Sequence, residues 1–262
     1  MRPRWRKVLS DLFDNKARTL LVVLTIAVGV FAIGVLVGAY VIIQDDMGVS
    51  YASNNPANIE IRMEDFDEDI LNTMRNVDGV ADAEGRWVFG VRVRPMGADE
   101  WTAINIVTID DFEENTINLL VPVSGTAAPE KNEILLQKEI LEEFDVAPGE
   151  TIEFQLADQT VKPIYVSGIV ADSSTDAIDF LAPPLGYITP KTLRLFNEPE
   201  GYFNRLYATV EEGKDDKDHI VEVLGRLKDK AEKNDYIVFR TFNSKTHEHP
   251  LGSTINAVLG IR

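Results

Sequence analysis

The chain has 262 residues, with 26 basic and 43 acidic side chains, a formal net charge of −17 at pH 7 and no cysteine. Such an acidic protein is a poor ligand for nucleic acid, and its surface would be repelled by anionic lipid. The missing cysteines exclude disulfide bonds and thiol chemistry. About 200 residues, the length that follows the apolar stretch described next, can bury a sufficient core without them.

Residues 20–43 read LLVVLTIAVGVFAIGVLVGAYVII and contain no charged side chain. A helix of this length measures roughly 36 Å at about 1.5 Å per residue, enough to cross a hydrocarbon core of about 30 Å. We therefore predict a transmembrane helix over residues 19–44. The alternative is a cleaved signal peptide, for which residues 50–52 offer a weak small-x-small site, but the apolar run is far longer than a usual signal sequence.

The charges that flank this helix predict its orientation. Two acidic residues, Asp45 and Asp46, follow it, whereas six basic residues precede it: Arg2, Arg4, Arg6, Lys7, Lys16 and Arg18. Because basic residues near a span stay on the cytoplasmic side, we expect a cytoplasmic N-terminus and an extracytoplasmic main domain, held at the cell (inner) membrane.

Residues 1–18 carry an apolar stripe with the spacing of an amphipathic helix. We predict that this helix lies in the cytoplasmic membrane interface, and contact with a cytoplasmic partner is the alternative. The candidate membrane-interface residues are Trp5, Leu9, Leu12 and Phe13.

Within the predicted span, small residues recur one helical turn apart. Gly34 and Gly38 form one such pair, and Thr25 and Gly29 form another. Small side chains let a second helix approach closely. These four residues are therefore the candidate helix-packing site, and they favour a helix that packs against other membrane helices.

After the span, the hydrophobic pattern predicts an α+β subdomain built from residues 45–117 and 200–245. Its first part has a strand at 58–62, a helix ending near Asn76, a long strand region at 80–94 and a hairpin partner at 101–109. Its second part has a strand at 205–210, a helix at 219–233 and a strand at 236–241. This succession is typical of a split βαβ, ferredoxin-like unit.

Residues 118–199 differ from the segments on either side, because they consist mostly of short predicted strands and turns. Pro122, Gly125 and Pro129 suggest a linker, followed by a short helix at 137–144 and strands at 133–136, 151–156, 161–170 and 187–189. We interpret this segment as a small β-rich insert in the α+β unit. Residues 246–262 become apolar, so we expect them to begin a second membrane segment.

Few residues in the sequence are suited to catalysis or metal binding. There is no GxxxxGK[ST] phosphate loop, and His247-Glu248-His249 is too compact for the HExxH zinc helix. Asp65, Asp67 and Asp69 alternate as in a calcium loop, but that loop needs Gly and Glu where this chain has Ile70 and Asn76. We expect these carboxylates to lie at a helix N-terminus instead. We predict no catalytic, cofactor-binding or metal-binding residues and no enzyme.

Several short segments resemble one membrane-protein family. They are NKARTL at 15–20, TIAVGV at 25–30, APEKNEILL at 128–136, DVAPGETI at 145–152, and His249-Pro250 before an apolar run. In this order they are similar to segments of the MacB/FtsX-like permeases of ABC transporters, over essentially the whole chain. The chain would correspond to the N-terminal part of such a permease.

The resemblance implies a permease subunit that couples cytoplasmic ATP hydrolysis by a partner subunit to movement of an extracytoplasmic domain, for export or mechanotransmission. The implied partners are an ABC ATPase subunit and a second permease copy, as a homo- or heterodimer, within the lipid membrane. Two other functions share this architecture. One is the sensor region of a membrane receptor such as a histidine kinase, and the other is a tethered binding protein with a single span.

Overall fold

The computed structural model describes residues 16–172 and 182–248. It divides into two units, Met1–Met47 and Gly48–Arg262, and each is considered by itself. The predicted interface residues Trp5, Leu9, Leu12 and Phe13 lie outside the described residues. So does the predicted second membrane segment from residue 249 onward.

Helix α2, Lys16–Ser53, contains the predicted span and continues beyond it. Its segment Lys16–Ala39 is long and apolar enough to cross a membrane, and none of that segment is buried. The prediction ended the helix at residue 44, where the apolar run gives way to carboxylates. Charge marks the edge of a hydrocarbon core but does not break a helix. The break comes later, where Asn55 adopts a left-handed conformation, with φ of 44°, just before Pro56.

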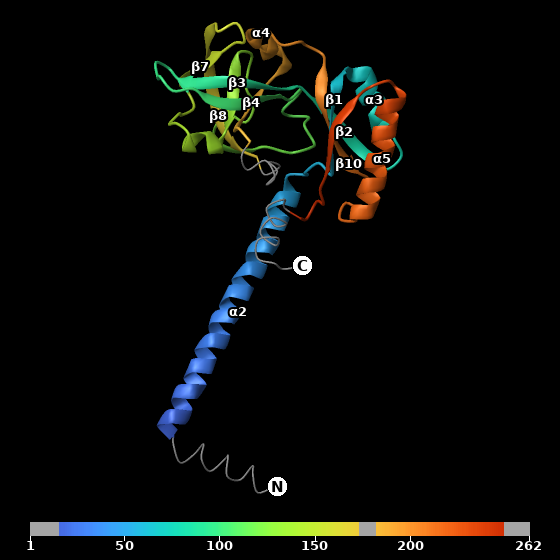
Figure 1. The fold of residues 1–262 in the computed structure, drawn as a ribbon. Helices are drawn as coiled ribbons and strands as arrows, with labels where there is room; N and C mark the ends of the chain where they lie inside the picture. Colours follow the sequence, from blue (N-terminus) through green and yellow to red (C-terminus); the bar gives the residue numbers. More distant parts are fainter. Residues whose placement is uncertain (1–15, 173–181, 249–262) are drawn as a thin grey trace. The chain divides into compact units, whose positions relative to one another are not determined.

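The first sheet of the second unit has four antiparallel strands in the order β11-β1-β10-β2 (Figure 1). The strands are β1 (Ile59–Phe66), β2 (Val80–Arg86), β10 (Phe203–Val210) and β11 (Val238–Asn243). Helices α3 (Glu68–Arg75) and α5 (Lys217–Lys233) connect them as two βαβ halves. The order and the connections are those of the split βαβ unit expected from the sequence.

Apolar residues that alternate along the strands form the core between this sheet and helices α3 and α5. Ile59, Ile61 and Met63 on β1 pack with Leu71 of α3 and Leu227 of α5, and all five are buried. The acidic run before α3 acts as a helix cap, because the Asp67 carboxylate accepts a hydrogen bond from the backbone N–H of Ile70. The expectation that these carboxylates cap a helix is therefore confirmed.

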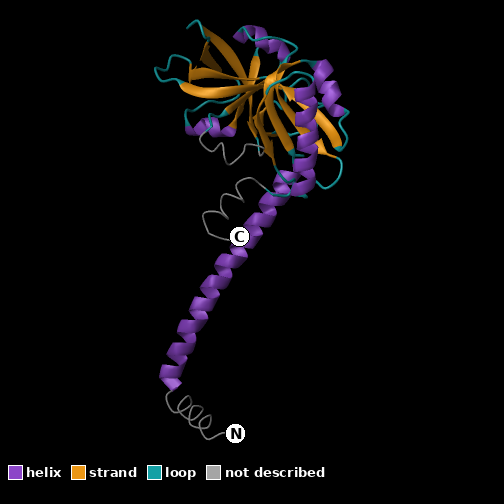
Figure 2. Cartoon of the chain, turned by 45° about the vertical axis from the view of Figure 1, so that its right-hand side comes forward, coloured by secondary structure: helices purple, strands orange, loops and turns teal. Residues whose placement is uncertain are grey.

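The second sheet has seven strands in the order β5-β8-β6-β9-β4-β3-β7, and β7 also pairs with β8. Strands β8, β6, β9, β4, β3 and β7 therefore close into a ring, with β5 attached outside it. Figure 2 shows the strands of both sheets in orange. The strands are β3 (Val88–Pro95), β4 (Thr102–Thr108), β5 (Val121–Gly125), β6 (Glu133–Gln137), β7 (Thr151–Gln155), β8 (Val161–Ala171) and β9 (Leu185–Ile188). Two short 3₁₀ turns and one helix complete it: η1 (Lys138–Glu142), η3 (Pro190–Thr192) and α4 (Leu193–Phe196).

The strand assignment differs from the predicted one in three places. The long strand region at 80–94 is two strands, and the hairpin β3–β4 belongs to the seven-stranded sheet, where it pairs with β7 and β9. The predicted linker contains β5, an exposed edge strand that tolerates Pro122. The predicted helix at 137–144 is the 3₁₀ turn η1. The sequence pattern of a hairpin predicts that its two strands pair with each other, but it does not predict which sheet the hairpin joins. The domain division at residues 117 and 199 stays a prediction.

Candidate functional site at the junction of the two sheets

The two sheets of the second unit are joined through residues 109–120, the segment between β4 and β5, which we call the junction loop. Its backbone binds the turn that follows α2. The N–H groups of Asn118 and Leu119 donate to the carbonyls of Asn55 and Asn54, at 3.0 and 2.9 Å. In return, the N–H of Ala57 donates to the side chain of Asn118 at 2.8 Å. The end of α2 is thus hydrogen-bonded directly to the junction loop.

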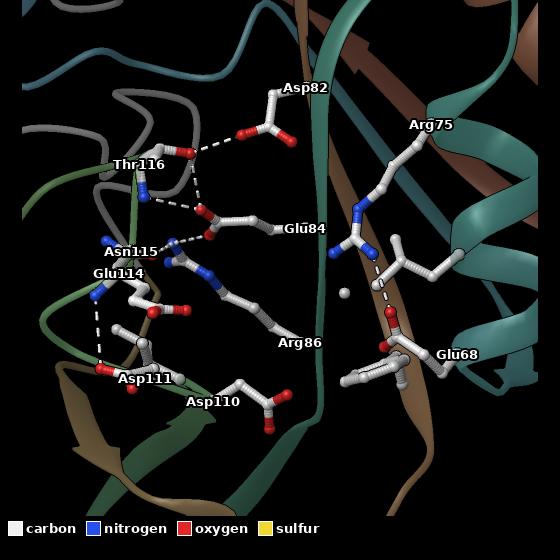
Figure 3. A pocket seen from close by; sticks show the side chains of 14 residues that line it. Glu68, Arg75, Asp82, Glu84, Arg86, Asp110, Asp111, Glu114, Asn115 and Thr116 are labelled. Atoms are coloured by element: carbon white, nitrogen blue, oxygen red, sulfur yellow. Dashed lines mark hydrogen bonds and ion pairs between the residues drawn. The ribbon is translucent and has the colours of Figure 1, made fainter.

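Arg86, the last residue of β2, ties the same loop to the four-stranded sheet (Figure 3). Its side chain is almost fully buried, with 3 % of the residue exposed. The Nη2 atom donates to Glu84 and to the side chain of Asn115, both at 3.0 Å, and to the carbonyl of Ile117 at 2.6 Å. The guanidinium carbon also lies 5.1 Å from the ring centre of Tyr207. One buried cation therefore connects β2, β10 and the junction loop.

Two carboxylates on the same face of β2 reinforce this connection. Glu84 accepts hydrogen bonds from the backbone N–H groups of Thr116 and Ile117, at 2.8 and 3.0 Å. Asp82 accepts one from the Thr116 hydroxyl at 2.6 Å. Asp82, Glu84 and Arg86 alternate along β2, so all three side chains lie on the face opposite α3 and α5. Their spacing in the sequence could have suggested a polar contact surface, which the sequence analysis missed.

The junction loop begins and ends in the seven-stranded sheet; the chain itself crosses between the sheets after β2 and before β10, and these two crossings are bonded to each other. The N–H of Val88, at the start of β3, donates to the side chain of Asn204, and that side chain donates back to the carbonyl of Val88, both at 2.9 Å. The indole of Trp87 donates to Glu198 at 2.9 Å, and its backbone N–H donates to the hydroxyl of Thr108. Hydrogen bonds therefore lock the strand that leaves the first sheet to the strand that returns.

A second polar centre joins the first and last described segments of the second unit. Asn58, just before β1, is 1 % exposed. Its amide nitrogen lies 3.3, 3.2 and 2.9 Å from the Lys214 carbonyl, the Ser244 carbonyl and the Thr246 hydroxyl, and its oxygen accepts from the Val210 N–H at 3.2 Å. Asn58 thus bonds the segment that enters the unit to the segment that leaves it.

Two more contacts bring these segments together. A Cβ at Gly48 would lie 2.7 Å from the carbonyl oxygen of His247, so only glycine fits there. The backbone N–H and the ring of His247 both bond the Asp215 carboxylate, at 2.9 and 2.7 Å. Burial raises the pKa of Asp215, but these bonds from His247 outweigh it and leave the pKa below its ordinary value. The first and last described segments of the unit therefore meet at one place.

Beside Arg86 lies an open, polar pocket of about 280 Å³, in which six of the 14 lining residues are acidic (Figure 3). Burial raises the pKa of Asp110 in this pocket, and the nearby Glu68 carboxylate raises it further, while Arg75 opposes both. Among the described residues, no three His, Asp or Glu side chains are arranged to hold a metal ion.

The Asp110 carboxylate predicts a pH-dependent stability. A carboxyl whose pKa is raised on folding costs stability when ionised, and this cost is present above its folded pKa and absent below its unfolded pKa of about 3.9. Replacing Asp110 by Asn should therefore raise the melting temperature at pH 7 by about 1–3 °C and leave it unchanged near pH 3.5. Thermal unfolding at both pH values, with Asp111→Asn as the control, checks this. An equal increase at both pH values would contradict it.

The predicted helix-packing residues all lie on α2. The Thr25 hydroxyl donates to the Leu21 carbonyl at 2.8 Å, within the helix itself. A Cβ added at Gly29, Gly34 or Gly38 would meet no described atom within 4 Å. The three glycines therefore leave shallow places on the helix surface, and their role in helix packing stays a prediction.

Comparison with known proteins adds a family match. The family model described as the MacB-like periplasmic core domain matches residues 19–231. No curated protein matches the chain.

The chain is also similar to solved structures. One is the extracellular domain of the noncanonic ABC-type transporter YknZ from Gram-positive bacteria, with 15% identity and a TM-score of 0.46, covering 69% of this chain and 100% of that one. Another is the periplasmic region of MacB from Actinobacillus actinomycetemcomitans, with 12% identity and a TM-score of 0.45, covering 80% of this chain and 96% of that one.

Proposed function

Because the chain belongs to the MacB-like periplasmic core domain family, we propose that it is the first membrane helix and the external domain of an ABC transporter permease subunit. In this proposal, ATP hydrolysis by a partner subunit in the cytoplasm moves the external domain through α2. The observation that carries it is the extent of the family match, which begins at Thr19 within α2 and continues through both sheets to Ala231. This family is a component of transporter permeases and not an enzyme by itself.

The contacts at the junction supply a route for such movement. Helix α2 is unbroken from Lys16 to Ser53, and the next residues bond the junction loop through Asn54 and Asn55. That loop is bonded in turn to Arg86 of the four-stranded sheet and leads into β5 of the seven-stranded sheet. We propose that a displacement of α2 reaches both sheets through this loop.

The meeting of the two ends at Asn58 supports a second membrane connection. We propose that residues 246–262 begin a second membrane segment, so that the unit is held at the membrane at both ends. The N-terminus is then cytoplasmic, as the flanking basic residues favour, with Trp5, Leu9, Leu12 and Phe13 in the interface.

We also propose that residues 118–199 act as a subdomain inserted into the α+β part. A second permease copy then completes the membrane bundle.

The test of this function uses the natural protein in its own membranes. We expect an affinity-tagged protein to co-purify with an ABC ATPase subunit. We also expect spin labels at two exposed sites, Val161 on β8 of the seven-stranded sheet and Val221 on α5 beside the four-stranded sheet, to change their mutual distance when a non-hydrolysable ATP analogue is added. Purification without an ATPase subunit, or a partner with a kinase core, would overturn the proposal and favour the receptor alternative.

The glycines of α2 provide a separate prediction. In Gly34→Leu and Gly38→Leu, a branched side chain fills the shallow part of the helix surface that a partner helix would occupy. The amount of partner subunit that co-purifies should therefore fall about tenfold. Val28→Phe is the matched control, because residue 28 lies on the side of the helix between the two faces that carry the small-residue pairs, and the change adds as much bulk as glycine to leucine. Partner recovery that falls equally in the control and the glycine variants would contradict the prediction.

A further inference from the structure

The face of the four-stranded sheet that lies away from α3 and α5 carries a row of arginines. The core-facing residues of β1 pack against α3 and α5, so the alternate residues, including Arg62, lie on the other face. The strand register places Arg62 opposite both Arg240 and Arg205, and Arg205 opposite Arg86. One residue from each strand therefore forms a continuous row of four cations across the sheet.

Such a row is unfavourable unless it meets negative charge, because like charges on directly opposed residues of a sheet destabilise it. Part of the row is neutralised within the protein. Glu60 lies 2.6 Å from Arg62 and 3.8 Å from Arg205, and Glu84 lies 3.0 Å from Arg86. Arg240 differs from the others. It is exposed, and among the described residues no carboxylate pairs with it.

Aromatic side chains surround the exposed end of the row. The guanidinium carbons of Arg240 and Arg62 each lie 4.6 Å from the ring centre of Phe242. Phe239 is 65% exposed and Ile237 is 57% exposed, both beside or within the edge strand β11. Arginine and aromatic residues are enriched at the energetic centres of protein interfaces, whereas exposed apolar side chains of this size are costly without a partner.

We propose that these five residues, which we call the β11 patch, form a docking surface for an acidic polypeptide segment of a partner protein. Its members are Ile237, Phe239, Arg240, Phe242 and Arg62. A carboxylate of the partner would bind Arg240 through charge-assisted hydrogen bonds, and a neighbouring apolar side chain would cover Phe239. Charge complementarity selects this occupant. Arg240 carries the uncompensated positive charge of the patch, because Arg62 pairs with Glu60 and the Glu64 carboxylate accepts a hydrogen bond from the Ile237 N–H. The chain as a whole has a net charge of −17, so the surrounding surface repels an anionic bilayer.

A binding experiment with the full chain in detergent tests the proposal. The probes are the fluorescein-labelled acidic peptide ELELELE and its uncharged counterpart QLQLQLQ, measured by fluorescence anisotropy. We expect ELELELE to bind more tightly, and Arg240→Gln to weaken its binding about tenfold while leaving QLQLQLQ unchanged. Phe239→Ser should weaken the binding of both peptides. The matched control is Arg226→Gln, since Arg226 is an arginine on α5 that pairs with Asp78 and Glu222.

Three results would overturn the proposal. The first is equal binding of the two peptides or no binding by either. The second is binding to phosphatidylglycerol vesicles that Arg240→Gln abolishes while the peptides fail to bind, which would identify a lipid surface. The third is self-association of the chain that the same variant removes, as measured by analytical ultracentrifugation, without peptide binding; the occupant would then be a second copy.

Discussion

Replacing Arg86 by methionine should lower the free energy of unfolding by about 3–5 kcal/mol. Methionine fills most of the space of the arginine stem but cannot donate to Glu84, Asn115 or the carbonyl of Ile117. The partly buried Glu84 carboxylate then loses its cation, and the junction loop loses the bonds that Asn115 and Ile117 make with β2 through Arg86. Urea unfolding of the full chain in detergent measures the change, and the fluorescence of the adjacent Trp87 reports it.

Arg75→Met is the matched control for this variant. Arg75 lines the same pocket and pairs with Glu68, but its side chain is 37% exposed. An exposed ion pair contributes little, and the bond from Arg75 to the Ala83 carbonyl contributes about 1 kcal/mol, so this variant should lower the free energy of unfolding by only about 1–2 kcal/mol. Arg86→Lys should fall between the two, because lysine keeps the charge but loses the planar donor geometry. If the two methionine variants lost equal stability, Arg86 would have no special role at the junction.

Asn58→Asp should destabilise the protein by about 3 kcal/mol or more, exceeding the loss in Asn58→Ala of about 2–3 kcal/mol. Alanine leaves the buried acceptors and the Val210 N–H without their partner. Aspartate keeps the bond from Val210, but it places a buried carboxylate against the carbonyls of Lys214 and Ser244, where the amide donated hydrogen bonds. The order of the two variants in chemical unfolding is the diagnostic result.

Ser244→Ala is the control with which the stability loss of the Asn58 variants is compared. The Ser244 hydroxyl donates to the Ala57 carbonyl at 2.8 Å beside the Asn58 centre, in a partly buried place. Its loss should cost about 1 kcal/mol, as expected for a single hydrogen bond. If Asn58→Ala cost no more than Ser244→Ala, Asn58 would not be the residue that joins the two ends of the unit.

Much of the local structure follows from short-range patterns in the sequence. The uncharged run in α2 and the apolar stripe on α5 depend only on residues a few positions apart, so their helices were predictable. The strand–helix–strand rhythm on both sides of the middle segment likewise predicted the split βαβ unit. The end of α2 was harder, because its extension to Ser53 depends on where a helix breaker stands and not on where hydrophobicity ends.

The candidate sites were less predictable because they depend on contacts between distant segments. The alternation of Asp82, Glu84 and Arg86 marked a polar strand face, but nothing near them in the sequence shows that Ile117 and Thr116 cover that face. Similarly, Arg240 and Arg62 are 178 residues apart in the sequence, and only the register of β11 against β1 places them side by side.

The apolar helix, its flanking charges and each short segment that resembles the family could be recognised in the sequence, because each depends on residues close together in the chain. The folded structure was needed to show that β3 and β4 join the seven-stranded sheet, that Arg86 binds the junction loop and that Asn58 joins the first and last described segments of the second unit. An isolated strand or a buried polar group is satisfied by whichever partner the folded chain brings to it. That partner is set by the whole fold and not by its neighbours in sequence.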